Sequence, residues 1–309
     1  INNLASTAVS THLLNYDSVH GALSTPCQVN GDMMNYQMAG KDHQVSFSHE
    51  QDPKNIPWRN KCVDMVFECS GAFTTRAGAS KHLHDDAMSV LISAPAENPD
   101  LTVVCGVTDH LLRGHERILS NASCTTGCLA PVCKVILDHF SLSRVTMTTV
   151  HAITGDQRIL DGPHKDLRRA RTSMLSMIPT TTGAAKMVAQ VLPQLTGKID
   201  GIAVRVPTAN VSLCDVVMQL NQPTTSDQIN DVLKTASASS MKNIIKINDI
   251  PLVSTDFNGS SSSSIVDTSF TKVIDDTLVK LLLWYDNEMG FSARMLDVAQ
   301  MWNNARKRG

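Results

Sequence analysis

A cysteine at position 124 has the neighbours that a reactive thiol needs. It lies in the stretch SNASCTTGCLAP (120–131), among small hydroxyl residues and just before an apolar run with helical spacing. If a helix starts near Thr125, its unpaired N–H groups and its dipole favour an anion at Cys124 and lower the pKa of the thiol. The alternative is a buried structural cysteine, which is the commoner role.

A thiol nucleophile also needs a base. His151 lies near the end of TMTTVHAIT (146–154), a stretch with the composition of a strand. A cysteine and a histidine from distant segments can form the activated pair of covalent catalysis. Most single histidines are structural, so the elements that carry Cys124 and His151 must bring them together for this hypothesis to hold.

The composition is that of an ordinary soluble protein of about two domains. The chain has 309 residues, 42% of them hydrophobic, and a formal net charge of −2. This charge favours neither nucleic acid nor a membrane surface as a partner, and no apolar run reaches the roughly 18 residues of a membrane helix. The eight cysteines form no CxxC pair, so we expect no metal site and read them as reduced thiols of a cytoplasmic protein.

Short apolar strands alternate with helix-compatible stretches in the first half of the chain. Residues 63–68, 87–93 and 101–107 are predicted strands, and 75–86 is a helix-compatible stretch between the first two. This alternation predicts βαβ units and a doubly wound parallel sheet over the first 120 residues.

The pattern in the second half of the chain predicts a different arrangement of strands and helices. Its strands are longer, at 144–153, 201–206 and 211–220, and its helices are 183–192, 226–237 with Ser226 as N-cap, and 290–306. Long strands with helices on one side predict an α+β arrangement.

Several long motifs resemble phosphorylating glyceraldehyde-3-phosphate dehydrogenases, in the family's order and over essentially the whole chain. They are INNLAS with HLLNYDSVHG, ISAPAE, SNASCTTGCLAP, TTVHAIT, HKDLRRAR, IPTTTGAAK, VRVPTANVS and WYDNEMGFS. The resemblance implies an α/β fold: a Rossmann-type doubly wound parallel sheet and an α+β catalytic domain with a mostly antiparallel sheet. It places the dinucleotide-binding domain at 1–123, with 289–309 packing back on it, and the catalytic domain at 124–288.

The resemblance also implies a reaction. Cys124 attacks the aldehyde of glyceraldehyde 3-phosphate, and His151 takes up the proton and helps to bind the oxyanion. Hydride passes to NAD, a thioester remains on Cys124, and inorganic phosphate releases 1,3-bisphosphoglycerate. Erythrose-4-phosphate dehydrogenase is the nearest alternative, but its relatives tend to lose Thr154, Thr182 and Gly183, which are intact here.

Two anion sites follow from the same resemblance. Thr154, Asp156 and Arg205 match the site of the substrate phosphate, where Asp156 is expected to orient Arg205. Ser123, Thr182, Gly183 and Arg169 match the site of the attacking phosphate, and Thr125 is also expected to bind substrate or phosphate. A helix N-terminus and a forked guanidinium both suit phosphate, although a basic run such as 168–171 is otherwise typical of a solvated loop.

For the cofactor, the resemblance assigns the nicotinamide carboxamide to Asn287. It places Ser70, Gly71 and Ser93 along the dinucleotide, where ordinary turn chemistry is the alternative. Asn3 stands where the family usually has an acidic residue that holds the adenosine ribose. Asparagine does not repel the extra phosphate of NADP, so NAD is expected with weaker discrimination against NADP.

Two further departures from the family bear on function. No G-x-G-x-x-G turn occurs in these residues, and the resemblance begins at the end of the second strand. We therefore expect a piece of a longer protein; the alternative, a chain without that segment, would bind dinucleotide weakly and could be a catalytically silent binding protein. Gly127 replaces the family's usual asparagine and is expected to loosen the helix by up to about 1 kcal/mol. The family also implies a homotetramer.

Overall fold

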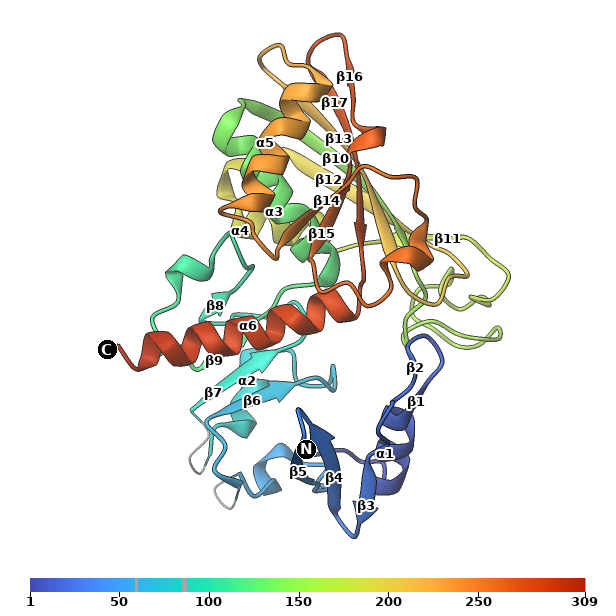
Figure 1. Cartoon of the computed structure of the whole chain (residues 1–309), viewed down its shortest axis with the longest axis vertical. Coiled ribbons are helices and arrows are strands. Elements are labelled where there is room, and N and C mark those ends of the chain that lie inside the picture. The colour runs from blue at the N-terminus through green and yellow to red at the C-terminus, as the bar shows by residue number, and fades with distance from the viewer. Residues whose placement is uncertain (59–60, 85–87, 309) are drawn as a thin grey trace.

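The structure is a computed structural model that describes residues 1–58, 61–84 and 88–308. Two sheets dominate it, one on each side of the long helix α6 (Met289–Arg306). Figure 1 shows the larger sheet with its helices above α6, and most of the smaller sheet below it. The N-terminus lies in the lower part, and the chain ends at the far end of α6.

The smaller sheet has four strands, and every pair in it is parallel. The order is β6 (Met65–Glu68), β7 (Ser89–Ile92), β9 (Ile118–Ser120) and β8 (Leu101–Thr102). This confirms the predicted Rossmann-type parallel sheet. The strand predicted at 101–107 stops at Thr102, because the chain turns there and the Val104 carbonyl accepts from the N–H of Val107.

Helix α6 covers one face of this parallel sheet. Met295, Val298 and Trp302 pack in one cluster with Leu91 of β7 and Leu119 of β9. The Trp302 indole N–H donates to the carbonyl of Glu116 at 3.1 Å. The end of the chain is therefore anchored on the sheet by both apolar contact and a hydrogen bond.

The larger sheet has eight strands and is mostly antiparallel, as predicted. Its order is β11 (Ile178–Thr181), β12 (Ile199–Arg205), β10 (Leu142–His151), β13 (Ser212–Leu220), β17 (Leu278–Tyr285), β15 (Ser264–Asp267) and β14 (Ile245–Asn248), with β16 (Lys272–Ile274) also on β17. Only the pairs β10–β12 and β14–β15 are parallel. Burial alternates along β13 and β17, as expected of strands with one face on a core.

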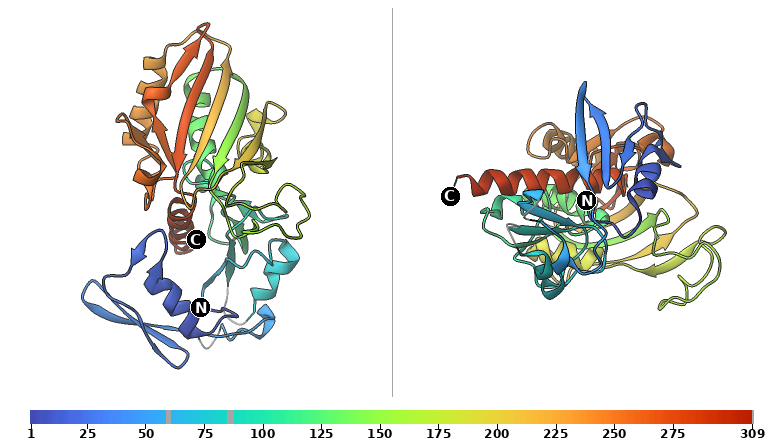
Figure 2. Two further views of the ribbon diagram at one scale, coloured as in Figure 1. Left: turned by 90° about the vertical axis from the view of Figure 1, so that its right-hand side faces the viewer. Right: turned by 90° about the horizontal axis from the view of Figure 1, so that it is seen from below.

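Three helices cover the buried face of this sheet, as the left view of Figure 2 shows. They are α3 (Cys124–His139), α4 (Ala184–Val191) and α5 (Ser226–Ala238). Fully buried side chains such as Leu129, Val188 and Leu233 join one core with the sheet. The N-cap of α5 is Thr225 and not Ser226, because Thr225 and Gln228 form a capping box.

Residues 1–48 form a small α+β unit with its own cluster of Cys27, Met34 and Phe47. A bridge between Asn2 and Ser48 closes it. Its elements are α1 (Thr7–Asn15), β1 (Tyr16–Asp17), β2 (Gly21–Ala22), β3 (Gln28–Asn30), β4 (Met33–Met38) and β5 (Lys41–Ser46).

The remaining elements are short. They are α2 (Arg76–Ala79) and the 3-10 helices at Pro53–Asn55, Ser80–His82, Asp109–Leu111, Pro193–Leu195, Ser254–Phe257 and Thr268–Phe270. The helix-compatible stretch at 75–86 thus contains two short helices; residues 85–87, which include the predicted start of the next strand, lie outside the described part. Within that part, no helix is long and apolar enough to cross a membrane.

Candidate active site

Cys124 is the first residue of α3, one position earlier than the predicted helix start. Ser123 is the N-cap, and its hydroxyl accepts from the N–H of Thr126 at 3.2 Å. The thiol therefore lies at the N-terminus of the helix, where the N–H of Thr125 favours its charged form. The Cys124 residue is half-buried, and all eight cysteines are free thiols.

The structure brings His151 to Cys124. The nucleophile candidate begins α3 and the base candidate ends β10, which packs under α3 in the same core. His151 Nε2 lies 3.6 Å from Cys124 Sγ. This distance is within the reach of a sulfur hydrogen bond, so a proton can pass directly from sulfur to nitrogen.

The contacts of Nδ1 indicate which nitrogen of His151 carries the proton. Nδ1 lies 2.7 Å from the carbonyl oxygen of Ala152, which can only accept. The tautomer with a proton on Nδ1 satisfies this carbonyl and leaves a lone pair on Nε2, facing the thiol. In this tautomer Arg205 Nη1, which lies 2.9 Å from Nδ1, donates to the Ala152 carbonyl at 3.1 Å and not to the ring nitrogen.

Burial and Arg205 control the titration of this pair. Burial raises the pKa of the Cys124 thiol, although the Thr125 hydroxyl and N–H and the charge of Arg205 oppose the rise. Burial and the nearby Arg205 lower the pKa of His151 to about 4. Both shifts act toward the neutral forms, a thiol beside an imidazole.

Arg205 lies beside the pair because of strand register. The last residues of the parallel strands β10 and β12, His151 and Arg205, are direct Cα partners. Arg205 Nη1 also donates to the Thr154 hydroxyl at 3.4 Å. His151, Thr154 and Arg205 thus meet at one sheet end, as expected for an anion site.

Asp156 does not orient Arg205, and that prediction was wrong. Its Oδ2 accepts from Arg169 Nη1 at 2.6 Å, and its Oδ1 lies 3.4 Å from His164 Nε2. The reason is the loop 152–177, which folds back so that Arg169 reaches the edge strand β11. Burial would raise the pKa of Asp156, but Arg169 and His164 hold it below its usual value.

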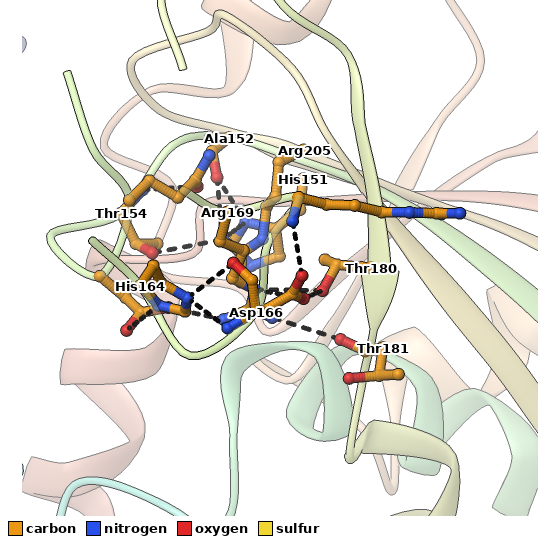
Figure 3. Close-up of polar contacts among 12 residues, drawn as sticks. His151, Ala152, Thr154, His164, Asp166, Arg169, Thr180, Thr181 and Arg205 are labelled. Carbon is orange, nitrogen blue, oxygen red and sulfur yellow. Dashed lines mark hydrogen bonds and ion pairs between the residues drawn. The ribbon is translucent and has the colours of Figure 1, made fainter. Parts of the chain in front are cut away.

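Arg169 is held from three sides, as Figure 3 shows. Besides Asp156, Nε donates to the Thr180 hydroxyl at 3.1 Å and Nη2 donates to the Thr181 carbonyl at 3.3 Å. The Thr180 hydroxyl in turn donates to Asp166 Oδ2 at 2.6 Å. Sequence reasoning placed Arg169 at an anion site but missed His164, Asp166 and Thr180; the first two lie in the motif HKDLRRAR.

The other residues predicted to bind substrate or phosphate have separate placements. Gly183 is the N-cap of α4 without a side-chain cap, and the Thr182 hydroxyl accepts from the N–H of Ala184 at 3.2 Å. The Thr125 hydroxyl pairs with the buried Tyr285 hydroxyl at 2.9 Å. Thr125 is thus engaged in the core, whereas the N-terminus of α4 keeps backbone N–H groups for an anion.

The candidate cofactor residues lie at two places. Ser70, Gly71 and Ser93 follow the carboxyl ends of β6 and β7, where dinucleotides bind in parallel sheets. Gly71 has φ +73°, a conformation that favours glycine. Asn3 is exposed in the N-terminal unit, where its carbonyl oxygen contacts His49 at 2.6 Å.

Asn287 has the geometry that a carboxamide partner needs. It follows β17, and its Oδ1 accepts from the Ser212 hydroxyl at 2.8 Å. This bond leaves the Asn287 amide hydrogens to donate elsewhere. The residues present thus fit a nicotinamide carboxamide. Among the described residues, no cluster of three or more His, Cys, Asp or Glu side chains could hold a metal.

A parallel sheet of the dinucleotide-binding type beside a thiol–imidazole pair and two arginines is typical of one class of protein, the dehydrogenases. Comparison with known families agrees. The model of the glyceraldehyde-3-phosphate dehydrogenase C-terminal domain matches residues 123–287, and that of the NAD-binding domain of the same enzyme matches residues 1–76. The chain belongs to the glyceraldehyde-3-phosphate dehydrogenase family.

Curated relatives match almost the whole chain. Glyceraldehyde-3-phosphate dehydrogenase of Geobacillus stearothermophilus is 50% identical over 97% of this chain and 88% of its own length. Glyceraldehyde-3-phosphate dehydrogenase 1 of Bacillus subtilis is 48% identical over the same shares. Glyceraldehyde-3-phosphate dehydrogenase 2 of Synechocystis is 46% identical over 97% of this chain and 89% of its own.

Proposed function

We propose that this chain catalyses the NAD-dependent, phosphorylating oxidation of glyceraldehyde 3-phosphate, with Cys124 as nucleophile and His151 as base. The observation that carries the proposal is the 3.6 Å contact between Cys124 Sγ and His151 Nε2, made by two elements that are distant in sequence. Family membership supports the same reaction over the erythrose 4-phosphate and silent-protein alternatives.

The residues divide the chemistry between them. Cys124 Sγ bonds to the aldehyde carbon as its proton passes to Nε2 of His151, and His151 returns that proton to the carbonyl oxygen to give a hemithioacetal. His151 then takes the hydroxyl proton as a hydride, with its two electrons, leaves the carbon, so that a thioester remains on Cys124. A phosphate oxygen attacks the thioester carbon, the C–S bond breaks, and the electron pair returns to sulfur.

Two arginines support separate anions in this scheme. Arg205, with Thr154, lies next to the thiol–imidazole pair and suits the phosphate of the aldehyde substrate. Arg169 and the N-terminus of α4, with Ser123, suit the attacking phosphate. Asp156 belongs with Arg169 in this assignment, because that is the guanidinium it contacts.

Asn287, Ser70, Gly71 and Ser93 are the residues we assign to the dinucleotide. When bound, NAD supplies the acceptor for the hydride that leaves the hemithioacetal carbon. We also propose that NADP is tolerated, because the neutral Asn3 does not repel an extra phosphate at the ribose. NADP kinetics of Asn3→Asp test this: the variant should discriminate more strongly against NADP than the parent chain does.

We further propose a dinucleotide-binding domain at 1–123, completed by 289–309, a catalytic domain at 124–288, and a cytoplasmic homotetramer. The loop 152–177 supports self-association, because it exposes large apolar side chains. They are Ile159, Leu160, Leu167, Leu175 and Met177, which are between 68% and 86% exposed. Contiguous exposed apolar surface commonly marks a protein interface, and light scattering of the purified chain tests the assembly.

The activity test is formation of reduced nicotinamide, followed by its absorbance, with glyceraldehyde 3-phosphate, NAD and inorganic phosphate. Turnover should require phosphate and should be lost in Cys124→Ser, whereas the buried neighbour variant Cys133→Ser serves as the control. Turnover that persists in Cys124→Ser would refute the assignment of the nucleophile.

A further inference from the structure

Arg169 has donors left over for a ligand, and its surroundings fix where they lie. A guanidinium carries five N–H groups. Three contacts, to Asp156, Thr180 and Thr181, leave one N–H on Nη1 and one on Nη2. Two adjacent N–H groups can bind two oxygens of one phosphate. The direction of this pair depends on the contacts that hold the guanidinium.

The charged one of these supports, the side chain of Asp156, is open to solvent. It is 51% exposed, whereas Arg169 is 20% exposed. An exposed carboxylate next to an arginine ordinarily gains little from the ion pair, because it loses rotamer entropy to hold one geometry. Something must restrict Asp156 if it is to hold Arg169 in one place.

His164 is the group that does so. Its side chain is only 7% exposed and its Nε2 lies 3.4 Å from Asp156 Oδ1. On the other side of the ring, Nδ1 lies 2.9 Å from the N–H nitrogen and 3.1 Å from the carbonyl oxygen of Asp166. Since a carboxylate can only accept, the contact with Asp156 requires the proton on Nε2, and the shorter Asp166 contact is then an N–H that donates to Nδ1.

These contacts form a closed ring of hydrogen bonds that includes the guanidinium, and Figure 3 shows His164, Asp166, Arg169 and Thr180 of this ring. Arg169 pairs with Asp156, which is bound by His164, which accepts from Asp166. Asp166 accepts from the Thr180 hydroxyl, and that hydroxyl accepts from Arg169. Both imidazole nitrogens of His164 take part in this ring of hydrogen bonds. Since His164 does not contact the thiol–imidazole pair, it can act only through its neighbours.

We propose that His164 is a positioning residue for the attacking phosphate: its Nε2–H fixes Asp156, and Asp156 fixes the two free N–H groups of Arg169. The inference rests on the proposed function, since it gives Arg169 the attacking phosphate. It assigns His164 no part in acylation of Cys124.

Two amide substitutions test separately the contact of His164 with Asp156 and its contact with Asp166. In His164→Gln the amide N–H reaches the place of Nε2 and keeps the bond to Asp156. In His164→Asn the amide oxygen takes the place of Nδ1 and keeps the bond to Asp166, but nothing reaches Asp156. Both side chains are neutral and polar, so we expect the two substitutions to change the stability of the fold by similar amounts. His139→Phe, at the far end of α3, is a control outside the site.

The assays are the KM for inorganic phosphate and the burst of reduced nicotinamide formed without phosphate. His164→Asn should raise the KM for phosphate roughly tenfold, the effect of losing one hydrogen bond to a charged group. His164→Gln should stay within about threefold of the parent chain. The burst rate and the KM for the aldehyde should change less than about twofold in both variants.

The outcomes separate this inference from the proposed function. An unchanged phosphate KM in His164→Asn, an equal rise in both variants, or a burst that falls along with phosphate use would overturn the role of His164. A parent chain that gives no burst at all would instead refute the proposed function. Arsenate, used as a second nucleophile, should show the same pattern as phosphate.

Discussion

Tyr285→Phe tests how the core holds the nucleophile and the base together. The Tyr285 hydroxyl is 2.9 Å from the Thr125 hydroxyl on α3 and 2.8 Å from the Thr149 hydroxyl on β10. Cys124 precedes Thr125, and His151 lies two residues after Thr149, with its ring edge-on to Tyr285 at 5.9 Å. One buried hydroxyl therefore links helix α3, which carries Cys124, to strand β10, which carries His151.

The cost of removing this hydroxyl follows from its contacts. Tyr285, Thr125 and Thr149 are all at least 95% buried. Two hydrogen bonds at about 1 kcal/mol each are lost, and the Thr149 hydroxyl loses the partner it has here, so the free energy of unfolding should fall by about 2–3 kcal/mol. Acylation should slow by about tenfold if the Cys124–His151 distance loosens by a few tenths of an ångström.

Urea denaturation measures the first effect, and the rate of Cys124 alkylation by iodoacetamide measures the second. Tyr36→Phe, on the N-terminal hairpin, is the matched control and should change neither. In a double-mutant cycle with Thr149→Val, a coupling energy of about 1 kcal/mol is expected. Additive effects, or a Tyr285→Phe variant as stable as the parent chain, would refute this reasoning.

Three further predictions concern stability. Gly127→Ala should raise the free energy of unfolding by about 0.5–1 kcal/mol, because the helical backbone there has open space for a Cβ; a loss of stability in urea denaturation would contradict this. Gly201→Ala should lower it by more than about 2 kcal/mol, because a Cβ would lie 2.5 Å from the Met147 carbonyl oxygen; parent-like denaturation would contradict it. Burial would raise the pKa of Glu68, but hydrogen bonds from His82 and Ser70 lower it overall. The folded state thus favours the charged form of Glu68. Its contribution to the free energy of unfolding is therefore fully present above about pH 5 and is lost as pH falls through the folded pKa. Glu68→Gln should make the free energy of unfolding depend less on pH in this acidic range.

The parts of the site that lie within one motif were predictable. The helix start at Cys124 follows from the small hydroxyl residues before an apolar run. The placement of Arg205 beside His151 depends on the register of two neighbouring strands, which the sequence alone does not reveal. The family motifs supplied that information instead.

The parts that depend on the path of a loop were not predictable. Asp156 was assigned to Arg205 because the resemblance implies that both belong to the site of the substrate phosphate, but the loop 152–177 brings Arg169 to Asp156 instead. His164 had no signal of its own beyond its place in HKDLRRAR. For α5, a signal existed: Thr225 with Gln228 three residues later is a capping box, which outranks the adjacent Ser226.

The most direct test of the account is to find the thioester. The chain is mixed with glyceraldehyde 3-phosphate and NAD without phosphate, quenched in acid, digested and analysed by mass spectrometry. The account predicts one 3-phosphoglyceroyl group on the peptide that contains Cys124, lost when phosphate is added before the quench. An adduct on another cysteine, or reduced nicotinamide formed with no adduct on Cys124, would contradict it.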